Sequence, residues 1–205
     1  MDMVTTGSPF ALAHSAPLDP AKFADPFLTA KGERRASVPL DRLETLWLNT
    51  GTLCNLACTS CYIESSPRND ALVYLSLAEA IGYLDEAAAL GTREIGFTGG
   101  EPFMNPDCVA MIEAALDRGF EVLVLTNAMR PMRRFEARLA PLAGRSLTMR
   151  VSLDHHRREV HEAERGAGTW DKAVDGLLWL ARTGFRVAVA GRRLPSESEA
   201  EARAG

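Results

Sequence analysis

From residue 43 onward, short apolar runs alternate with longer amphipathic segments, and this alternation restricts the chain to very few folds. The runs are rich in β-branched or aromatic residues, as buried strands are. They occupy residues 43–48, 94–98, 120–126, 147–153 and 185–190. Because parallel strands need a helix for each return crossing, the alternation predicts an α/β fold with a parallel sheet. Right-handed crossovers allow either a barrel or an open doubly wound sheet, and the pattern alone does not choose between them.

Residues with strong capping preferences mark the expected helices between these runs. The expected limits are a capping box of Ser76 and Glu79 with an end at Gly91, a start at Asn105–Pro106 with an end at Gly119, a segment from Pro131 to about Leu142, and a segment from Thr169 to Gly184. Ser196 and Glu199 predict one more capping box close to the end of the sequence. Since that helix has only begun at residue 205, we interpret the chain as truncated at its C-terminus, with a frayed natural tail as the alternative.

The first 40 residues differ from the rest and are expected to form an irregular arm before a core at residues 41–205. Prolines interrupt this arm repeatedly, although Ala21–Leu28 could form a short helical turn. The net charge is −4, so the chain carries no sign of a nucleic-acid or membrane-surface partner. No secretory signal is visible and the cysteines do not resemble a disulfide framework, which predicts a cytoplasmic protein.

Three of the four cysteines lie within eight residues, at Cys54, Cys58 and Cys61. The fourth, Cys108, falls inside an expected helix, where it would act as a small buried apolar residue. Structural zinc sites use four protein ligands, and cubane iron–sulfur clusters usually use four cysteines. With three cysteines, a cubane leaves one iron open to a substrate or cofactor. We therefore expect the fourth ligand not to come from the protein.

Polar sequences follow four of the expected strands at their carboxyl ends. The cysteines follow the first, TGGEP (98–102) the second, TNA (126–128) the third, and SLDHH (152–156) the fourth. In parallel α/β folds, ligands bind at the carboxyl ends of the strands. Four such segments on one rim predict an active site there.

The motif C-x3-C-x2-C after a first strand, with GGEP after a second, resembles the radical S-adenosylmethionine superfamily over residues 41–191. That resemblance implies a partial (β/α)6 TIM-like barrel, whose sixth βα unit is missing from this sequence. It also implies a [4Fe–4S] cluster held by Cys54, Cys58 and Cys61. S-adenosylmethionine would chelate the open iron and, on receiving one electron, yield a 5′-deoxyadenosyl radical that abstracts hydrogen from a substrate.

The resemblance further implies cofactor contacts, carried over residue by residue. Gly99, Gly100 and Glu101 match the motif that receives the methionine amino group. The remaining matching positions are Ser152 at the fourth strand end, Arg165 for the methionine carboxylate, Asn127 on the rim, and Gly191 near adenine. An electron donor such as flavodoxin or ferredoxin is implied as a partner. The substrate is not.

One position departs from the family pattern, because the usual aromatic residue before the third cysteine is replaced by Ser60, with Tyr62 just after that cysteine. Tyr62 is a further candidate contact of the cofactor, and ring packing over the cluster must be supplied differently from the family pattern. The block 48–67 also resembles stand-alone radical enzymes with C-terminal extensions. The alternative function is a non-catalytic iron–sulfur or zinc-binding module. Trp47 and Trp170 are expected in the core rather than at the substrate.

Overall fold

Within the residues that the computed structural model describes, 24–39 and 41–204, five strands form one parallel sheet in the order β1-β2-β3-β4-β5. The strands are β1 Thr45–Asn49, β2 Glu94–Thr98, β3 Glu121–Thr126, β4 Leu147–Ser152 and β5 Arg186–Ala190. All five expected strands are confirmed, each within two residues of its expected limits. Every strand pairs with the next one along the chain, which is the order of a barrel. The alternation of strands and helices alone left the choice between barrel and open sheet undecided, and the family resemblance predicted the barrel.

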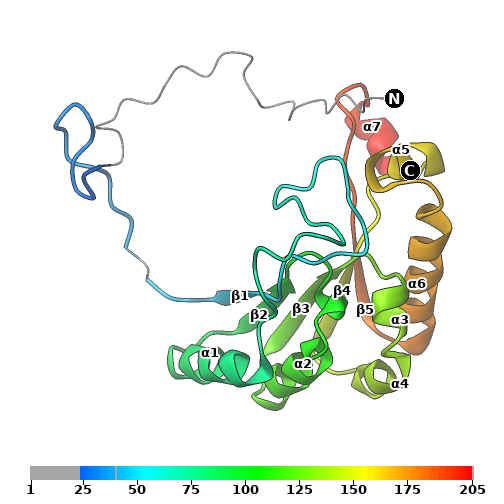
Figure 1. Cartoon of the computed structure of the whole chain (residues 1–205), viewed down its shortest axis with the longest axis horizontal. Helices are drawn as coiled ribbons and strands as arrows, with labels where there is room; N and C mark the ends of the chain where they lie inside the picture. The colour runs from blue at the N-terminus through cyan, green and yellow to red at the C-terminus, as the bar shows by residue number, and fades with distance from the viewer. Residues whose placement is uncertain (1–23, 40, 205) are drawn as a thin grey trace. The chain divides into compact units, whose positions relative to one another are not determined.

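Most of the helices lie along the outer side of the curved sheet, whereas α5 and α7 lie past the carboxyl end of β5 (Figure 1). They are α1 Leu77–Ala89, α2 Cys108–Asp117, α3 Arg130–Arg133, α4 Glu136–Leu139, α5 Arg158–Arg165, α6 Trp170–Thr183 and α7 Glu199–Ala204, with short 3-10 turns η1 Pro102–Met104 and η2 Ala140–Leu142. Phe97 of β2 and Phe103 of η1 are fully buried in the core that the sheet shares with these helices. Burying one such ring contributes about 2–3 kcal/mol. No helix in the described part of the chain is long and apolar enough to cross a membrane.

The other face of the sheet is less covered than the sequence predicts. Trp47, expected in the core, is 45% exposed, and its ring lies over Gly96 of the neighbouring strand. A Cβ at Gly96 would come within 2.4 Å of that ring, so the indole occupies the space a side chain would fill. Arg150 of β4 is exposed as well. Trp170 is half-buried at the start of α6.

The capping box of Ser76 and Glu79 is confirmed, with both hydrogen bonds present. The expected start of the second helix at Asn105 is wrong by two residues, because α2 begins at Cys108 with Asp107 before it. The Asn105 amide instead donates to the carbonyls of Thr50 and Leu75, at 3.0 and 2.8 Å. Asn105 therefore ties α2 to the segment that carries the cysteines.

The expected helix from Pro131 to Leu142 is broken into α3, α4 and η2. The break falls at Phe135, whose backbone leaves the helical region with φ −105° and ψ 13°. Its ring packs against Phe103, with ring centroids 6.3 Å apart. Tertiary packing thus overrides a continuous helical pattern here.

Two further helix expectations need correction. Helix α5 was not expected. Arg158–Arg165 has no side-chain cap, and its buried residue is His161, so the segment has neither a capping signal nor an apolar face. At the chain end, the capping box forms between Ser198 and Glu201, not between Ser196 and Glu199. Both pairs have the spacing of a capping box in the sequence. Glu197 stabilises the turn before α7, because its carboxylate accepts hydrogen bonds from the Leu194 amide and from His155.

Contacts divide the chain into two units, Met1–Asp41 and Arg42–Gly205. In the first, an antiparallel bridge joins Leu28 and Arg34, and the Asp25 carboxylate accepts hydrogen bonds from the amides of Phe27 and Leu28. The expected turn of helix at Ala21–Leu28 lies partly outside the described residues. The described part, Ala24–Leu28, is a turn without helix.

Candidate active site

The cysteines lie on the long segment between β1 and α1, residues 50–76, here called the cysteine loop. It runs over the carboxyl ends of the strands (Figure 1). Cys54 is buried, and Cys58 and Cys61 are half-buried; all three are free thiols. Backbone amides approach two of the sulfurs, from Leu56 to Cys54 Sγ at 3.4 Å and from Ser65 to Cys61 Sγ at 3.3 Å. Such N–H···S contacts suit sulfurs that carry negative charge as iron ligands.

The two glycines after β2 let the cysteine loop approach closely. A Cβ on Gly100 would lie 2.3 Å from the Leu53 carbonyl oxygen, and Gly99 has a φ of +142°. The amides of Gly100 and Glu101 donate to the carbonyls of Gly51 and Leu53, at 2.8 and 3.1 Å. These bonds extend the β1–β2 pairing past the strand ends and fix the start of the cysteine loop on the rim.

Glu101 carries a buried carboxylate at the centre of the rim, 2% exposed. One oxygen accepts from the Thr126 hydroxyl at 2.7 Å and the other from the Asn127 amide at 2.8 Å. Burial raises the pKa of Glu101 to about 7, and these hydrogen bonds only partly offset it. A cation beside this carboxylate would therefore be strongly favoured.

Asn127 turns its side chain toward the cysteine loop. Its amide donates to Asn55 Oδ1 at 2.9 Å, and its oxygen accepts from the Met129 amide at 3.1 Å. The strand end after β3 is thus joined both to Glu101 through its backbone and to the cysteine loop through its side chain.

Arg165, at the end of α5, brings a guanidinium to the rim beside Cys58. Its Nε and Nη2 donate to the two oxygens of Asp154, at 2.5 and 3.3 Å.

Burial raises the pKa of the Cys54 thiol to about 12, so this thiol needs a bound metal to lose its proton. Ser152 ends β4 half-buried and faces the same cavity.

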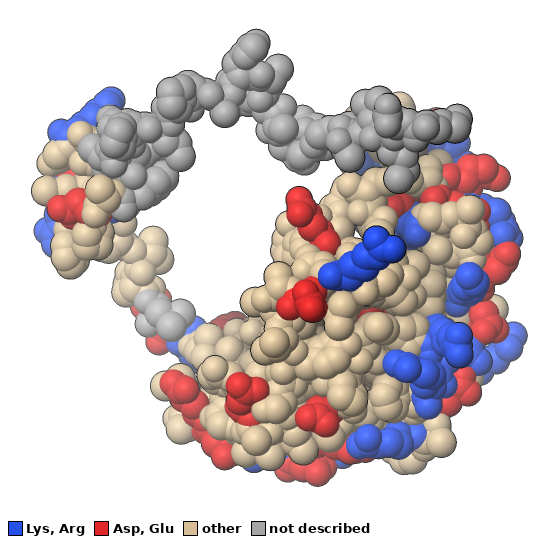
Figure 2. Space-filling view, in the orientation of Figure 1, with Lys and Arg blue, Asp and Glu red and all other residues tan. Residues whose placement is uncertain are grey.

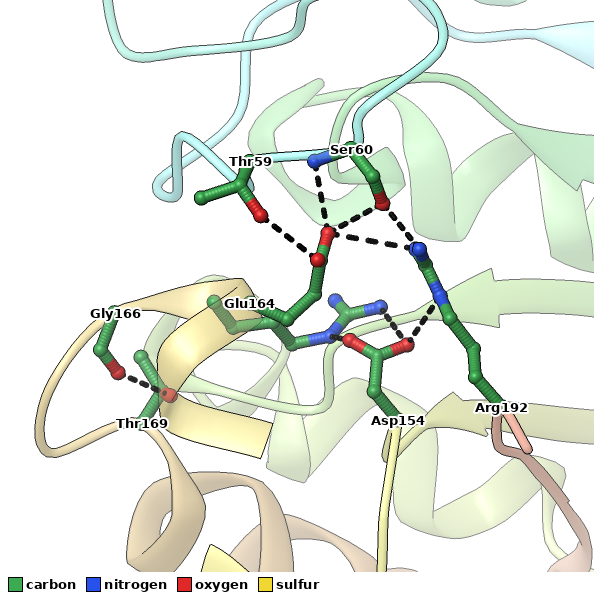
Figure 3. Close-up of polar contacts among 8 residues, drawn as sticks. Thr59, Ser60, Asp154, Glu164, Gly166, Thr169 and Arg192 are labelled. Atoms are coloured by element: carbon green, nitrogen blue, oxygen red, sulfur yellow. Dashed lines mark hydrogen bonds and ion pairs between the residues drawn. The ribbon is translucent and has the colours of Figure 1, made fainter. Parts of the chain in front are cut away.

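A polar cluster that the sequence did not reveal holds the cysteine loop to α5 and to the end of β5 (Figure 3). We call Thr59, Ser60, Glu164, Asp154 and Arg192 the clasp. Glu164 accepts from the Thr59 hydroxyl at 2.7 Å, the Ser60 amide at 2.9 Å and the Ser60 hydroxyl at 2.5 Å. Arg192 contacts Ser60, Glu164 and Asp154. Although burial alone would raise it, the pKa of Glu164 is lowered by the hydrogen bonds from Ser60 and Thr59.

The clasp accounts for the departure at Ser60. A hydroxyl at this position reaches Glu164 and Arg192, which an aromatic ring could not do. Glu164 and Arg192 lie more than a hundred residues from Ser60 in sequence. The one local signal was the unexpected serine itself.

All but one of the predicted site residues line one cavity of about 190 Å³ on this rim. These are Cys54, Cys58, Cys61, Tyr62, Gly99, Gly100, Glu101, Asn127, Ser152 and Arg165. Tyr62 is 84% exposed at its mouth. Gly191 is the exception, because it lines a neighbouring hollow with Asp154 and His155.

The donor set suits an iron–sulfur cluster, because three cysteines line one cavity and a cubane with one open iron takes three cysteine ligands. A structural zinc site uses four protein ligands. In a cubane each cysteine binds a different iron, so the three sulfurs surround a larger group without meeting at one point.

Fold and cavity together define a partial parallel α/β barrel with a cysteine triad and a buried carboxylate on its carboxyl-terminal rim. The chain belongs to the radical SAM superfamily, whose family profile matches residues 48–199. Membership confirms the resemblance drawn from the motifs, and it implies an iron–sulfur cluster and S-adenosylmethionine.

Curated relatives agree with this assignment. The mycofactocin maturase MftC of Mycobacterium ulcerans (strain Agy99) is 34% identical over 132 residues, which cover 64% of this chain and 35% of that protein. The antilisterial bacteriocin subtilosin biosynthesis protein AlbA of Bacillus subtilis (strain 168) is 31% identical over 138 residues, covering 67% and 30%. The chain thus spans about a third of the length of the curated relatives it matches.

Solved structures share the fold. Streptococcus suis SuiB bound to precursor peptide SuiA superposes with a TM-score of 0.68 at 18% identity, over 80% of this chain and 36% of that one. The same protein bound to S-adenosylmethionine gives a TM-score of 0.67 at 17% identity, over the same shares of the two chains. The partial TIM-like barrel expected from the sequence is therefore confirmed.

Proposed function

We propose that this chain is the core of a radical SAM enzyme in which Cys54, Cys58 and Cys61 hold a [4Fe–4S] cluster. The observation that carries the proposal is the shared cavity, where ligands from the cysteine loop meet polar groups from three further strand ends. A metal-binding knuckle would need none of those groups. When bound, the cluster supplies the electron that cleaves the carbon–sulfur bond of S-adenosylmethionine, giving methionine and a 5′-deoxyadenosyl radical.

Glu101 is proposed to accept the methionine ammonium group. Oε1 accepts from the Thr126 hydroxyl and the Phe103 amide, whereas Oε2 accepts only from the Asn127 amide and keeps acceptor capacity for a further hydrogen bond. Its burial removes competing water, so the incoming positive charge compensates a carboxylate that is otherwise unfavourable. Gly99 and Gly100 leave room for the cofactor to approach the backbone.

Arg165 is proposed to bind the methionine carboxylate. Asp154 occupies Nε and Nη2, and within the described residues Nη1 has no hydrogen-bond partner. A guanidinium fixed on one edge and open on another suits a carboxylate ligand. Ser152, Asn127 and Tyr62 are further proposed contacts on the cavity wall, and Gly191 is proposed to lie near adenine from the adjoining hollow.

The reaction needs one electron from outside, so an electron donor such as flavodoxin or ferredoxin is a proposed partner. A substrate that is to lose a hydrogen atom would have to reach the cavity lined by Glu101 and Arg165. The relatives' names include a bacteriocin biosynthesis protein, a heme synthase and GTP 3′,8-cyclase, so they do not favour one substrate class. A cytoplasmic location stays a prediction from the sequence.

The test uses the full chain, reconstituted with iron and sulfide without oxygen. Dithionite and S-adenosylmethionine are added, 5′-deoxyadenosine is measured by chromatography, and iron and zinc are counted. About four irons per chain with deoxyadenosine is the expected result. Glu101→Ala should keep the iron but weaken S-adenosylmethionine binding. Zinc without iron after reconstitution would overturn the proposal.

A further inference from the structure

A second hollow, of about 530 Å³, shares Leu56 of the cysteine loop with the cavity that contains Glu101. Its lining comes from the cysteine loop, η1, the segment around α3 and the start of α6: Asn55, Leu56, Met104, Met129, Arg130, Pro131, Arg134, Thr169 and Lys172. Leu56 lines both this hollow and the cavity that contains the cysteines, and it stands between Cys54 and Cys58 in sequence. The hollow and the cavity proposed for the cluster therefore adjoin each other at Leu56.

The hollow combines apolar and basic groups and contains no acidic residue. Leu56, Met104, Met129 and Pro131 supply the apolar part, and Arg130, Arg134 and Lys172 supply positive charge. The three basic residues are exposed. Figure 2 shows Lys and Arg side chains gathered over the α3 and α6 side of the molecule, whereas acidic side chains predominate over α1 and α2.

The acidic groups nearest to these residues in sequence are already paired. Asp171 forms two hydrogen bonds with Arg158, both at 2.5 Å, and Asp175 and Glu136 both pair with Arg133. Within the part of the chain that the structure describes, no carboxylate pairs with Arg130 or Lys172. The positive charge of the hollow is thus uncompensated and available to a partner.

We propose that this hollow is the docking surface for an acidic electron-transfer protein that reduces the cluster. The inference rests on the proposed function and gives a location to the partner which that function requires. One electron leaves the donor, which is oxidised, and enters the cluster, which is reduced by one electron. No covalent bond or proton changes place in this step.

Three features favour a redox protein over other occupants. Electron transfer requires close approach to the cluster, and Leu56 provides it. Redox encounters use small interfaces, and Met and Arg are enriched at protein contacts, as they are here. A substrate must instead reach the cavity with Glu101 and Arg165, neither of which lines this hollow.

The experiment measures the rate of cluster reduction in the anaerobically reconstituted full chain by stopped-flow absorbance. The donor is a reduced flavodoxin, an acidic protein, and the comparison reductant is reduced methyl viologen, a small cation. The variant is Arg130→Glu/Lys172→Glu. The matched control is Arg182→Glu at the far end of α6, an exposed residue outside the hollow. Lys172→Arg tests whether charge alone is needed.

The expected result is a second-order rate with flavodoxin that falls roughly 10- to 100-fold in the double variant at low salt. The wild-type rate should decrease as salt is added, and the variant rate should change little. Arg182→Glu and Lys172→Arg should stay within about twofold of the wild type, and the viologen rate should not fall in any variant.

Equal flavodoxin rates in the wild type and the double variant would overturn docking at this surface while leaving the proposed function intact. The same holds if the double variant loses only the binding of an anionic substrate. If iron analysis and absorbance find no cluster in the reconstituted wild-type protein, the proposed function fails together with the inference.

Discussion

The two ends of this parallel sheet each carry a hollow, and the larger hollow is not the one that contains the predicted site residues. The hollow at the amino ends of the strands is the larger, about 580 Å³ against about 190 Å³ for the cavity at the carboxyl ends. Its charged groups are ordinary surface residues, such as Arg118 paired with Asp85 and Arg42 paired with Glu44. It contains no cysteine and no buried carboxylate.

The carboxyl-end cavity contains groups that are costly to bury without a partner. Glu101 is desolvated, Cys54 is a buried thiol, and Arg165 is held against Asp154 beside Cys58. Such groups cost stability unless a ligand or metal compensates them. The comparison shows that buried ionisable groups, and not the volume of the hollow, distinguish the carboxyl end of the sheet from its amino end.

Removing a proposed cluster ligand should have the largest effect on this contrast. Cys58→Ala should reduce the iron content after reconstitution from about four per chain to nearly zero, since a cubane with two protein ligands is not retained. Iron analysis and the visible absorbance of the cluster measure this.

Cys108→Ala is the matched control. Cys108 is a fully buried free thiol in α2, outside the cavity. Its loss should cost about 1 kcal/mol of packing and leave the iron unchanged. If both variants lose iron equally, the cysteine triad is not the cluster site.

A pair of glycine substitutions compares the backbone at the two ends. Gly100→Ala places a methyl group against the backbone of Leu53 and Thr52, at 2.3 to 2.7 Å, and should lower the free energy of unfolding by roughly 3 kcal/mol or more. Gly119→Ala, at the amino-end hollow, meets no atom within 4 Å but has a φ of +85°, so about 1 kcal/mol is expected. Denaturant unfolding of the cluster-free protein gives both values. Equal losses would mean that the close approach at the cysteine loop is not essential.

The fold could be predicted where local sequence and tertiary packing agree. Both ends of the strand Glu94–Thr98 were predicted correctly. The capping box at Ser76 was predictable because it depends only on two residues three positions apart. The prediction failed where distant contacts decide. Phe135 breaks a helix by packing on Phe103, and Asn105 bonds to the cysteine loop rather than capping α2. No periodicity within the helix itself contains that information.

The same distinction applies to the site. The cysteines and Gly99–Glu101 are recognisable because each motif is contiguous, and they do converge on one cavity. The clasp was missed because Glu164 and Arg192 reach Ser60 only after folding. Their roles toward the cofactor, like those of all the site residues, are predictions for experiment.

Weakening the clasp should have an intermediate effect. Glu164→Gln removes the charge opposite Arg192 and presents an amide group to the Ser60 and Thr59 donors. We expect iron release to a chelator to become roughly 10-fold faster, as for other groups that orient metal ligands. A shifted electron paramagnetic resonance spectrum of the reduced cluster should accompany it.

Glu159→Gln is the matched control, since Glu159 is an exposed residue of the same helix and outside the cavity. It should release iron at the wild-type rate. Unchanged iron release and an unchanged spectrum in Glu164→Gln would reduce the clasp to a surface contact.

The smallest expected effect comes from the proton on Glu101. Burial raises its pKa to about 7 when the chain is folded, whereas the unfolded chain has the ordinary value near 4.5. The folded state therefore binds the proton more tightly, and this contribution to stability is lost as pH rises through 7. Between pH 6 and pH 8 the free energy of unfolding of the cluster-free protein should fall by about 1 kcal/mol through this group.

Glu101→Gln should lack this component, because its amide does not titrate in that range. Denaturant unfolding of both proteins at pH 6 and pH 8 isolates the difference from other titrating groups. Parallel pH dependence in the two proteins would show that Glu101 is ionised in the folded chain throughout, with a compensating cation already near it. In that case the electrostatic contrast between the two ends of the sheet would rest on the cysteines alone. A fall confined to the wild type means instead that Glu101 is left uncompensated until a cation enters the cavity.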